Sequence, residues 1–415
     1  MRITLLTYGS RGDVEPFVAL GVGFMGAGHN VRMAAPAGFE QLVTSHGIDF
    51  IGLPGDPDGL VQELVDKAGE NYLRMIRVMS KFVVPLAVGV LDRVNFACEN
   101  TELIIHSFLL TNAGYEIARE KGVHDFSAQF FPVFATTTEF PGIVFPDLPL
   151  GNLYRRLTHE FITQTFWQGS RFLYRWIRRS NSHLPPLTGW PFAVRSDRRT
   201  PILYAFSPYV LPPPADWRED VHVTGYWFMD DPEWRPPKKL LDFLDTGSTP
   251  IAIAFGSTLT RNPERMTDTI REALVLSRQR AVIVGKENHF NDPPDTVLQL
   301  DSAPYRWLFA RMSAVVHHGG AGTTGAGLLA GVPNIITPFT SDQPFWGHRV
   351  HTLGAGPKPI PAKKLTTQTL AESILAAVSD QDMRARAKAI GVQIRAEDGV
   401  ARTVDIIHRY VEAGA

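Results

Sequence analysis

Short apolar segments of strand length alternate with amphipathic segments of helix length in two separate series along the 415 residues. The first series predicts strands over residues 3–7, 31–35 and 49–52, with a helix over 15–27. The second series predicts alternating strands and helices between residues 251 and 337. This alternation is typical of parallel sheets with crossover helices. We therefore predict an α/β fold of two Rossmann-like, doubly wound domains that face each other across a cleft, with ligands at the carboxyl ends of the strands.

The chain length suits two domains better than one core. A proline-dense stretch between residues 212 and 237 indicates the connection between the domains. We assign residues 1–215 to an N-terminal domain and 216–395 to a C-terminal domain, and we expect residues 396–415 to form a helix that packs back on the N-terminal domain. Residues 140–195 break the alternation and are rich in aromatic side chains and arginine, which indicates helices and loops that enlarge or cover the first domain.

Charge and cysteine content exclude several classes of protein. The 41 basic and 42 acidic side chains give a formal net charge of -1, so no global field attracts a polyanion and a nucleic-acid partner is not expected. Cys98 is the single cysteine, which excludes an intramolecular disulfide and a cysteine-based metal site. The N-terminal apolar run is too short for a signal peptide, and no segment approaches the roughly 18 apolar residues that span a bilayer. These features predict a cytoplasmic protein, with peripheral contact to a membrane left open.

The strongest local signal is the segment His317-His-Gly-Gly-Ala-Gly-Thr-Thr324, which follows an apolar strand and opens a helix. Glycines let the backbone approach a ligand closely, and the first N–H groups of a helix carry a partial positive charge of roughly half a unit. Such a turn can hold a diphosphate without a metal, with His317 and a threonine as further donors. The alternative is an ordinary tight turn with a helix cap. A zinc site from His317 and His318 has little support, because adjacent residues on an extended strand point to opposite faces and no third ligand lies at a recognisable spacing.

A second glycine pattern is a chance match. Gly21-Val-Gly-Phe-Met-Gly26 has the spacing of the dinucleotide-binding fingerprint. It falls inside the first predicted helix, where helical bonding consumes the N–H groups that the chemistry requires. No acidic residue ends the second strand to hold a ribose.

These motifs together resemble those of a known family. Residues 302–343 resemble the donor signature of nucleotide-sugar-dependent glycosyltransferases with two Rossmann-like domains, the GT-B architecture. The opening Tyr8-Gly-Ser-Arg-Gly-Asp-Val-Glu-Pro16 resembles the start of sterol glucosyltransferases and of bacterial antibiotic glycosyltransferases. Residues 317–326, followed by Pro338-Phe-Thr-Ser-Asp-Gln343, are closest to the sterol branch. Residues 60–200, where the acceptor would bind, carry no motif that we can match.

The resemblance implies a donor site in the C-terminal domain. It places the nucleobase at Ser302 and Ala303. Plant relatives carry a tryptophan where this chain has Ser302, so stacking on the base from that position is absent here. It assigns Asp342 and Gln343 to the hydroxyls of the donor sugar, although a solvated loop is the alternative. The residues it assigns to the diphosphate are Ser257, His317, Gly320, Ala321, Gly322 and Thr323. Ser257 can instead cap the following helix.

Asp13 is the candidate catalytic base. Transfer with inversion requires one base on the acceptor hydroxyl, and Asp13 lies just beyond the carboxyl end of the first predicted strand. The resemblance implies that Asp13 acts directly, as in the sterol and antibiotic branches. The alternative is that Asp13 caps the helix that follows, or that it pairs with Arg11.

The sequence therefore predicts an inverting, metal-independent glycosyltransferase without a cofactor, which moves glucose from UDP-glucose to a hydroxyl of a lipophilic acceptor such as a sterol. A dTDP- or UDP-sugar transferase that acts on a polyketide, macrolide or glycopeptide is the first alternative. A non-catalytic protein that binds nucleotide-sugars or lipids is the second, and a sugar epimerase is a weaker one. Aromatic residues between 130 and 192 can line an acceptor pocket or form ordinary core. The basic residues among them can meet lipid headgroups or form a solvated helix face; they are Arg155, Arg156, Arg171, Arg175, Arg178 and Arg179.

Overall fold

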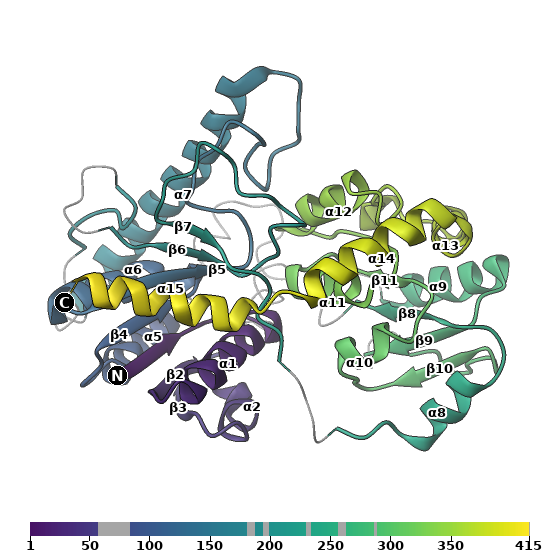
Figure 1. The fold of residues 1–415 in the computed structure, drawn as a ribbon, viewed down its shortest axis with the longest axis horizontal. Coiled ribbons are helices and arrows are strands. Elements are labelled where there is room, and N and C mark those ends of the chain that lie inside the picture. The colour runs from purple at the N-terminus through teal and green to yellow at the C-terminus, as the bar shows by residue number, and fades with distance from the viewer. Residues whose placement is uncertain are drawn as a thin grey trace. The chain divides into compact units, whose positions relative to one another are not determined.

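The structure is a computed structural model that describes residues 1–56, 84–180, 187–193, 199–229, 234–255, 263–285 and 289–414. The chain divides into two compact units (Figure 1). The first unit comprises Met1–Ala205, Pro213–Met229 and Asp398–Ala415, and the second comprises Phe206–Pro212 and Asp230–Glu397. Residues 216–229, which the sequence analysis gave to the second domain, thus group with the first unit, and residues 206–212 group with the second.

The first unit is built on a seven-stranded parallel sheet in the order β3-β2-β1-β4-β5-β6-β7. Its strands are β1 (Arg2–Leu6), β2 (Asn30–Pro36), β3 (Asp49–Leu53), β4 (Leu103–His106), β5 (His124–Gln129), β6 (Ile202–Tyr204) and β7 (Val221–Val223). Its described helices are α1 (Arg11–Gly26), α2 (Glu40–Thr44), α5 (Val84–Ala97), α6 (Thr111–Lys121), α7 (Gly151–Ser180) and α15 (Gly399–Gly414), with short 3-10 turns η1 (Ala37–Phe39) and η3 (Phe108–Leu110). The strand order reverses between β1 and β4, which is the switch point where doubly wound sheets bind ligands.

The second unit repeats the arrangement with five parallel strands in the order β10-β9-β8-β11-β12. The strands are β8 (Ile251–Ala254), β9 (Ala281–Val284), β10 (Val297–Leu300), β11 (Val315–His317) and β12 (Asn334–Ile336). The described helices are α8 (Lys238–Asp245), α9 (Pro263–Ser277), α10 (Tyr305–Phe309), α11 (Ala321–Ala330), α12 (Gln343–Thr352), α13 (Thr367–Ser379) and α14 (Gln381–Arg395), with the 3-10 turn η5 (Ala362–Lys364). Its switch point lies between β8 and β11.

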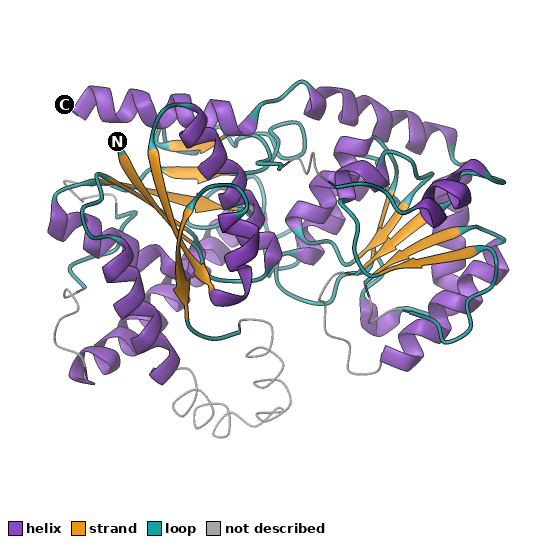
Figure 2. Cartoon of the chain, turned by 90° about the horizontal axis from the view of Figure 1, so that it is seen from below, coloured by secondary structure: helices purple, strands orange, loops and turns teal. Residues whose placement is uncertain are grey.

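Both sheets carry helices on both faces (Figure 2), which explains why strands such as β8 and β9 are apolar on every residue. All four residues of β8 and of β9 are buried. The core of the second unit joins these strands to apolar residues of α9 and α13, and a separate core in the first unit joins β1 and β4 to α5 and α6. The predicted α/β class is therefore confirmed.

The C-terminal helix α15 packs against α1 in the first unit. A Cβ atom at Gly23 of α1 would overlap with a methyl group of Val400, so the two helices come into close contact at this glycine. The buried indole of Trp227 adds a polar link, since its Nε1 donates to Thr403 Oγ1 at 2.9 Å. The final 16-residue helix is thus part of the first unit, although the residues before it belong to the second.

Two elements differ from the sequence prediction. The proline-dense stretch expected to be a connection contains β7, the last strand of the first sheet. Residues 140–195 contain one continuous helix of 30 residues, α7, where several helices and loops were expected. Gly21 and Gly26 lie within α1, as the rejection of the dinucleotide fingerprint required.

Candidate active site

The glycine-rich segment of the second unit lies at its switch point. It joins β11 to α11, and β11 is the strand next to β8. Gly320 is the N-cap of α11, so Ala321, Gly322 and Thr323 are the first three helical residues, whose N–H groups have no partner within the helix. These N–H groups form the positive end of the helix dipole. Ser257, which follows β8, lies outside the described residues.

His317 differs from the role that the resemblance implied. Its side chain is fully buried, its Nδ1 accepts from the backbone N–H of Gly319 at 3.1 Å, and its Nε2 lies 2.9 Å from Asn334 Oδ1. The Asn334 amide is oriented by its Nδ2, which donates to the Val332 carbonyl at 2.8 Å. Nε2 therefore carries the hydrogen, and both ring nitrogens are engaged inside the protein. Burial, with a smaller contribution from His318, lowers the pKa of His317 to about 3, so the ring is neutral at physiological pH and holds the loop together.

His318 was considered from the sequence only as half of a zinc pair and was not assigned to the donor site. Its Nδ1 is buried and has no hydrogen-bond partner among the described residues. The ring lies over the N-cap of α11, because a Cβ atom at Gly320 would come within 2.5 Å of His318 Nε2. Burial lowers the pKa of His318 to about 4, partly offset by the Ala254 carbonyl. Thr324 Oγ1, in the first turn of α11, is a second buried polar atom without a partner in the described part of the chain. A bound ligand or ordered water can complete the bonding of buried polar atoms that lack a protein partner at a helix start.

The loop before α12 lies directly against this turn. A Cβ atom at Gly319 would come within 3.1 Å of the Gln343 carbonyl oxygen, so the two segments approach at van der Waals distance. Gln343 Oε1 accepts the N–H groups of Phe339 and Thr340 at 2.8 and 3.2 Å, which fixes the loop conformation. Ser341 has a φ of +60°, an uncommon value for a residue other than glycine, and such positions concentrate at functional loops.

The carboxylate of Asp342 is held by a buried tryptophan. The Nε1 of Trp346, one helical turn later, donates to Asp342 Oδ2 at 2.9 Å. Burial raises the pKa of Asp342 to about 6, against the opposing effects of its own backbone and of the Trp346 and Ser341 hydrogen bonds. Trp346 is itself fully buried and makes an edge contact with Phe206, with ring centroids 5.4 Å apart. Asp342 was predicted from the sequence, whereas Trp346, whose hydrogen bond orients the carboxylate, was not.

Ser302 and Ala303, the predicted nucleobase residues, lie in the loop between β10 and α10. Ser302 is exposed and Ala303 is half-buried. Helix α10 packs against α11, so this loop belongs to the same side of the second unit as the glycine-rich turn. Six of the residues predicted to bind the donor thus lie at the carboxyl edge of the same sheet. They are Gly320, Ala321, Gly322, Thr323, Asp342 and Gln343.

Asp13 lies at the switch point of the first unit, in the first turn of α1 after β1. Its Oδ2 accepts both the backbone N–H and the hydroxyl of Ser10, at 2.8 and 3.1 Å. A Cβ atom at Gly9 would overlap with this carboxylate, so the glycine makes room for it. Arg11 Nε donates to Glu15 Oε2 at 2.7 Å. Ser10 is the N-cap of α1 and Asp13 its third helical residue, so Asp13 is not the N-cap that the alternative proposed. Its carboxylate instead completes a capping box with Ser10, which holds it in one orientation.

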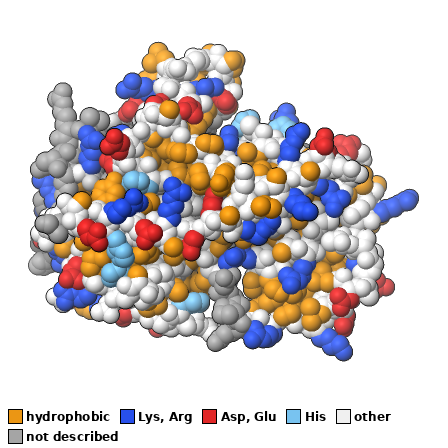
Figure 3. All heavy atoms as spheres, in the orientation of Figure 1, with side chains coloured by type: hydrophobic (Ala, Val, Ile, Leu, Met, Phe, Trp, Pro, Cys, Tyr) orange, Lys and Arg blue, Asp and Glu red, His pale blue; other side chains and the backbone are white. Residues whose placement is uncertain are grey.

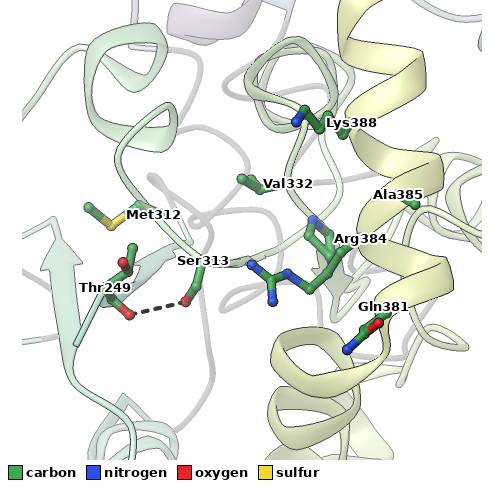
Figure 4. Close-up of a pocket in the computed structure, with 10 residues that line it drawn as sticks. Thr249, Met312, Ser313, Val332, Gln381, Arg384, Ala385 and Lys388 are labelled. Carbon is green, nitrogen blue, oxygen red and sulfur yellow. Dashed lines mark hydrogen bonds between the residues drawn. The ribbon is translucent and has the colours of Figure 1, made fainter.

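A cavity of about 300 Å³ lies elsewhere in the second unit, where Thr249, Ser313 and Pro333 precede β8, β11 and β12 (Figure 4). This is the amino edge of the sheet, opposite the glycine-rich turn, and none of the predicted site residues lines it. Among the described residues, no group of three histidine, cysteine, aspartate or glutamate side chains is placed to hold a metal ion. Within the same residues, no helix is long and apolar enough to cross a bilayer.

Two family models and several known proteins match this chain. The model for the glycosyltransferase family 28 N-terminal domain matches residues 3–94, and the model for the erythromycin biosynthesis protein CIII-like C-terminal domain matches residues 279–406. The O-mycaminosyltylonolide 6-deoxyallosyltransferase of Streptomyces fradiae is 37% identical over 99% of this chain and 98% of its own length. The sterol 3-beta-glucosyltransferase of Emericella nidulans is 35% identical over 99% of this chain, which spans only 30% of that longer protein.

Solved structures show the same fold at low sequence identity. The calicheamicin glycosyltransferase CalG4 aligns with a TM-score of 0.72 at 16% identity over 99% of this chain and 98% of its own. The glycotransferase of kitacinnamycin aligns with a TM-score of 0.70 at 20% identity over 98% of each chain. The chain belongs to the GT-B glycosyltransferases, in the family that includes bacterial antibiotic glycosyltransferases and sterol glucosyltransferases.

Proposed function

We propose that the protein transfers a hexose, with inversion and without a metal, from UDP-glucose to a hydroxyl of a lipophilic acceptor such as a sterol. The observation that carries the proposal is the start of α11. There the N–H groups of Ala321, Gly322 and Thr323 have no partner within the helix, and the ring of His318, whose Nδ1 is buried and unpaired among the described residues, lies over the N-cap Gly320. This set of donors suits the two phosphates of a nucleotide-sugar. The helix dipole stabilises the negative charge that develops on the leaving diphosphate, so no metal is required for that purpose.

In this proposal His318 takes the phosphate role that the resemblance assigned to His317. A phosphate beside the ring favours the protonated form, which compensates for the burial that lowers the His318 pKa to about 4. Ser302 and Ala303 would bind the nucleobase. Asp342 and Gln343 would bind the sugar, because a carboxylate and an amide can accept from and donate to neighbouring hydroxyls. Asp13 of the first unit would remove the proton from the acceptor hydroxyl.

A second candidate is transfer of a deoxysugar from a dTDP-sugar to a macrolide or a similar aglycone. The 37% identity with the 6-deoxyallosyltransferase of Streptomyces fradiae, over nearly the whole of both chains, favours this candidate. A solved relative of the same fold, VinC, was crystallised with dTDP. The carboxylate of Asp342 argues against this candidate. Because burial keeps water from the carboxylate, the hydroxyls of the bound sugar have to supply its hydrogen bonds, and a fully hydroxylated hexose has more of them than a deoxysugar.

The experiment that separates the candidates is a panel of donors and acceptors. We expect transfer of labelled glucose from UDP-glucose to a sterol in a lipid extract, identified by mass spectrometry, with inverted anomeric configuration. Activity should survive EDTA, and a requirement for added Mg²⁺ would contradict the metal-independent mechanism. Turnover with dTDP-deoxysugars and a macrolide, but not with UDP-glucose, would establish the second candidate instead.

Trp346→Phe should change how donor binding depends on pH. The substitution keeps an aromatic ring against Phe206 and removes the N–H that stabilises the ionised Asp342 carboxylate. Because burial already raises this pKa to about 6, loss of the hydrogen bond should raise it further. If the donor sugar binds to the ionised Asp342 carboxylate, donor affinity falls as the pH falls through the Asp342 pKa. The midpoint of the curve of donor affinity against pH should therefore be about one pH unit higher in the variant.

Calorimetric titration of UDP-glucose between pH 5 and 8 measures this midpoint. Free UDP is the internal control, because it lacks the sugar that Asp342 contacts and should bind the variant and the wild type alike. The idea fails if both nucleotides lose affinity equally, or if the midpoint for UDP-glucose stays where it is in the wild type.

We further propose that the protein works in the cytoplasm and meets its lipophilic acceptor at a membrane surface. A sterol-like alcohol resides in the bilayer rather than in water, because burial of its apolar area is favourable. An enzyme without a membrane-spanning helix in its described residues would then reach the acceptor from the interface.

A further inference from the structure

Helix α7 has an inward face that is firmly attached to the first unit. Tyr174 and Ile177 are buried in the core that also includes residues of α5 and α6. Nearer its start, His159 is buried and its Nε2 lies 3.0 Å from the Phe140 carbonyl. At 30 residues the helix is about 45 Å long. Figure 1 shows that its first turns project beyond the sheet of this unit. One side of α7 is therefore fixed, and the opposite side faces solvent.

The outward side carries a stripe of large apolar side chains. Leu153, Leu157 and Phe161 recur at intervals of four residues, and Phe172 and Trp176 repeat the interval. Eleven residues, about three turns, separate Phe161 from Phe172, so both groups lie on one side of the helix. These five side chains are between 37% and 72% exposed. The loop before the helix adds three more exposed apolar residues, Val144, Leu148 and Leu150.

This concentration is unusual for the molecule. Eight of the 17 large apolar side chains that are exposed in the described part of the chain fall between residues 144 and 176. Exposed apolar residues scattered singly are normal, whereas a contiguous patch indicates a surface that contacts something apolar. Hydrophobic side chains gather at the projecting end of this unit in Figure 3, with both basic and acidic side chains beside them.

The charge of α7 identifies what that surface meets. Six arginines against one glutamate give the helix a net charge of +5, while the whole chain carries -1. Arg156 and Arg175 are exposed, and Arg171 lies over the ring of Trp167 at 5.6 Å. A helix with arginine beside leucine, phenylalanine and tryptophan has the composition of a helix that lies in a membrane interface. A second copy of the same face would bring two sets of positive charge together, which disfavours a symmetric dimer through α7.

We propose that the outward face of α7 and the loop that precedes it dock on an anionic lipid bilayer, with the apolar stripe in the headgroup region and the arginines against lipid phosphates. This inference rests on the proposed function, because docking would bring the enzyme to an acceptor that is dissolved in the membrane. The binding surface itself depends only on residues of the first unit, whereas the donor loops belong to the second.

Co-sedimentation of the full chain with vesicles tests the surface. We expect binding to vesicles of phosphatidylcholine with phosphatidylglycerol, weaker binding to phosphatidylcholine alone, and loss of binding as salt rises. The double variant Arg156→Gln, Arg175→Gln should bind anionic vesicles about 30-fold more weakly. The double variant Leu157→Ser, Phe161→Ser should lose at least about tenfold in affinity. The matched control is Val275→Ser, Leu276→Ser on α9, which removes two equally exposed apolar side chains from the second unit and should bind like the wild type.

Binding is measured without donor or acceptor, so its outcome does not depend on catalysis. Absence of vesicle binding by an enzyme that transfers sugar to a detergent-dissolved acceptor overturns the docking surface and leaves the proposed function intact. Vesicle binding by a protein that neither binds nor hydrolyses UDP-glucose overturns the proposed function alone. The proposal is also overturned if the α9 control loses as much vesicle affinity as the α7 variants. The same holds if the α7 variants change from dimer to monomer in light scattering while their vesicle binding stays unchanged.

Discussion

Asp13→Asn should reduce sugar transfer by about 10²- to 10⁴-fold, the usual contribution of a general base. Asparagine has nearly the same shape as aspartate and can still accept the Ser10 hydrogen bonds, so the start of α1 should remain folded. It cannot take the proton of the acceptor hydroxyl, and it lacks the negative charge that favours positive charge developing on the sugar. Initial rates at saturating donor and acceptor measure the loss, and calorimetry should show unchanged affinity for UDP-glucose because the donor loops belong to the other unit.

Glu15→Gln is the matched control for this prediction. Glu15 is another carboxylate at the start of α1, and it pairs with Arg11 at the surface rather than with Ser10. Removing an exposed ion pair costs little stability, so the control should transfer sugar at nearly the wild-type rate. If Asp13→Asn retained turnover within a few-fold of the wild type, the base would have to be another group and Asp13 would serve only to cap the helix.

His318→Ala should weaken the binding of UDP and of UDP-glucose by the same factor, about 10- to 100-fold, because both carry the diphosphate. The side chain lies over the N-cap of α11, and its Nδ1 has no partner among the described residues. Its removal costs the hydrogen bond to the Ala254 carbonyl, so the loss of thermal stability should be smaller than for His317→Ala, which breaks two. Equal factors for the two nucleotides distinguish a phosphate contact from the sugar contact that Trp346→Phe tests.

His317→Ala provides the contrast. It would remove a fully buried ring and leave Asn334 Oδ1 and the Gly319 N–H without their partners, so we expect a loss of about 2–4 kcal/mol in the free energy of unfolding. Denaturant titration measures this loss. Two results together would show that His317 and not His318 binds the phosphate. His317→Ala would keep its stability and lose nucleotide affinity, and His318→Ala would bind nucleotides normally.

The two neighbouring histidines show where reasoning from sequence stops. The motif identifies the turn, because glycine after a strand and before a helix is a local signal with a local cause. It does not decide which of the two adjacent imidazoles is bonded inside the protein and which lies over the helix start. That choice depends on Asn334, 17 residues further along, whose side chain binds the ring of His317 and leaves His318 over the helix start.

The elements that sequence reasoning missed are those whose stability comes from distant partners. Strand β7 has three residues and lies in a proline-rich stretch, so it has almost no periodicity, and only its pairing with β6 makes it a strand. Helix α7 mixes aromatic and arginine residues around its circumference, and its buried residues become evident only once the core is known. Its exposed stripe could not be separated from ordinary core before burial was known, since both are apolar.

The amino-acid sequence by itself determined the α/β class, the strands at the centre of both sheets, the glycine-rich start of α11 and the position of Asp13 after β1, because alternating hydrophobicity and glycine at a turn act over a few residues. Only the tertiary structure decided that His317 is locked in the core, that Trp346 orients Asp342, and that one face of α7 is left apolar and positively charged toward solvent. The physical reason is that hydrogen-bond satisfaction and solvent exposure depend on residues brought together from distant parts of the chain.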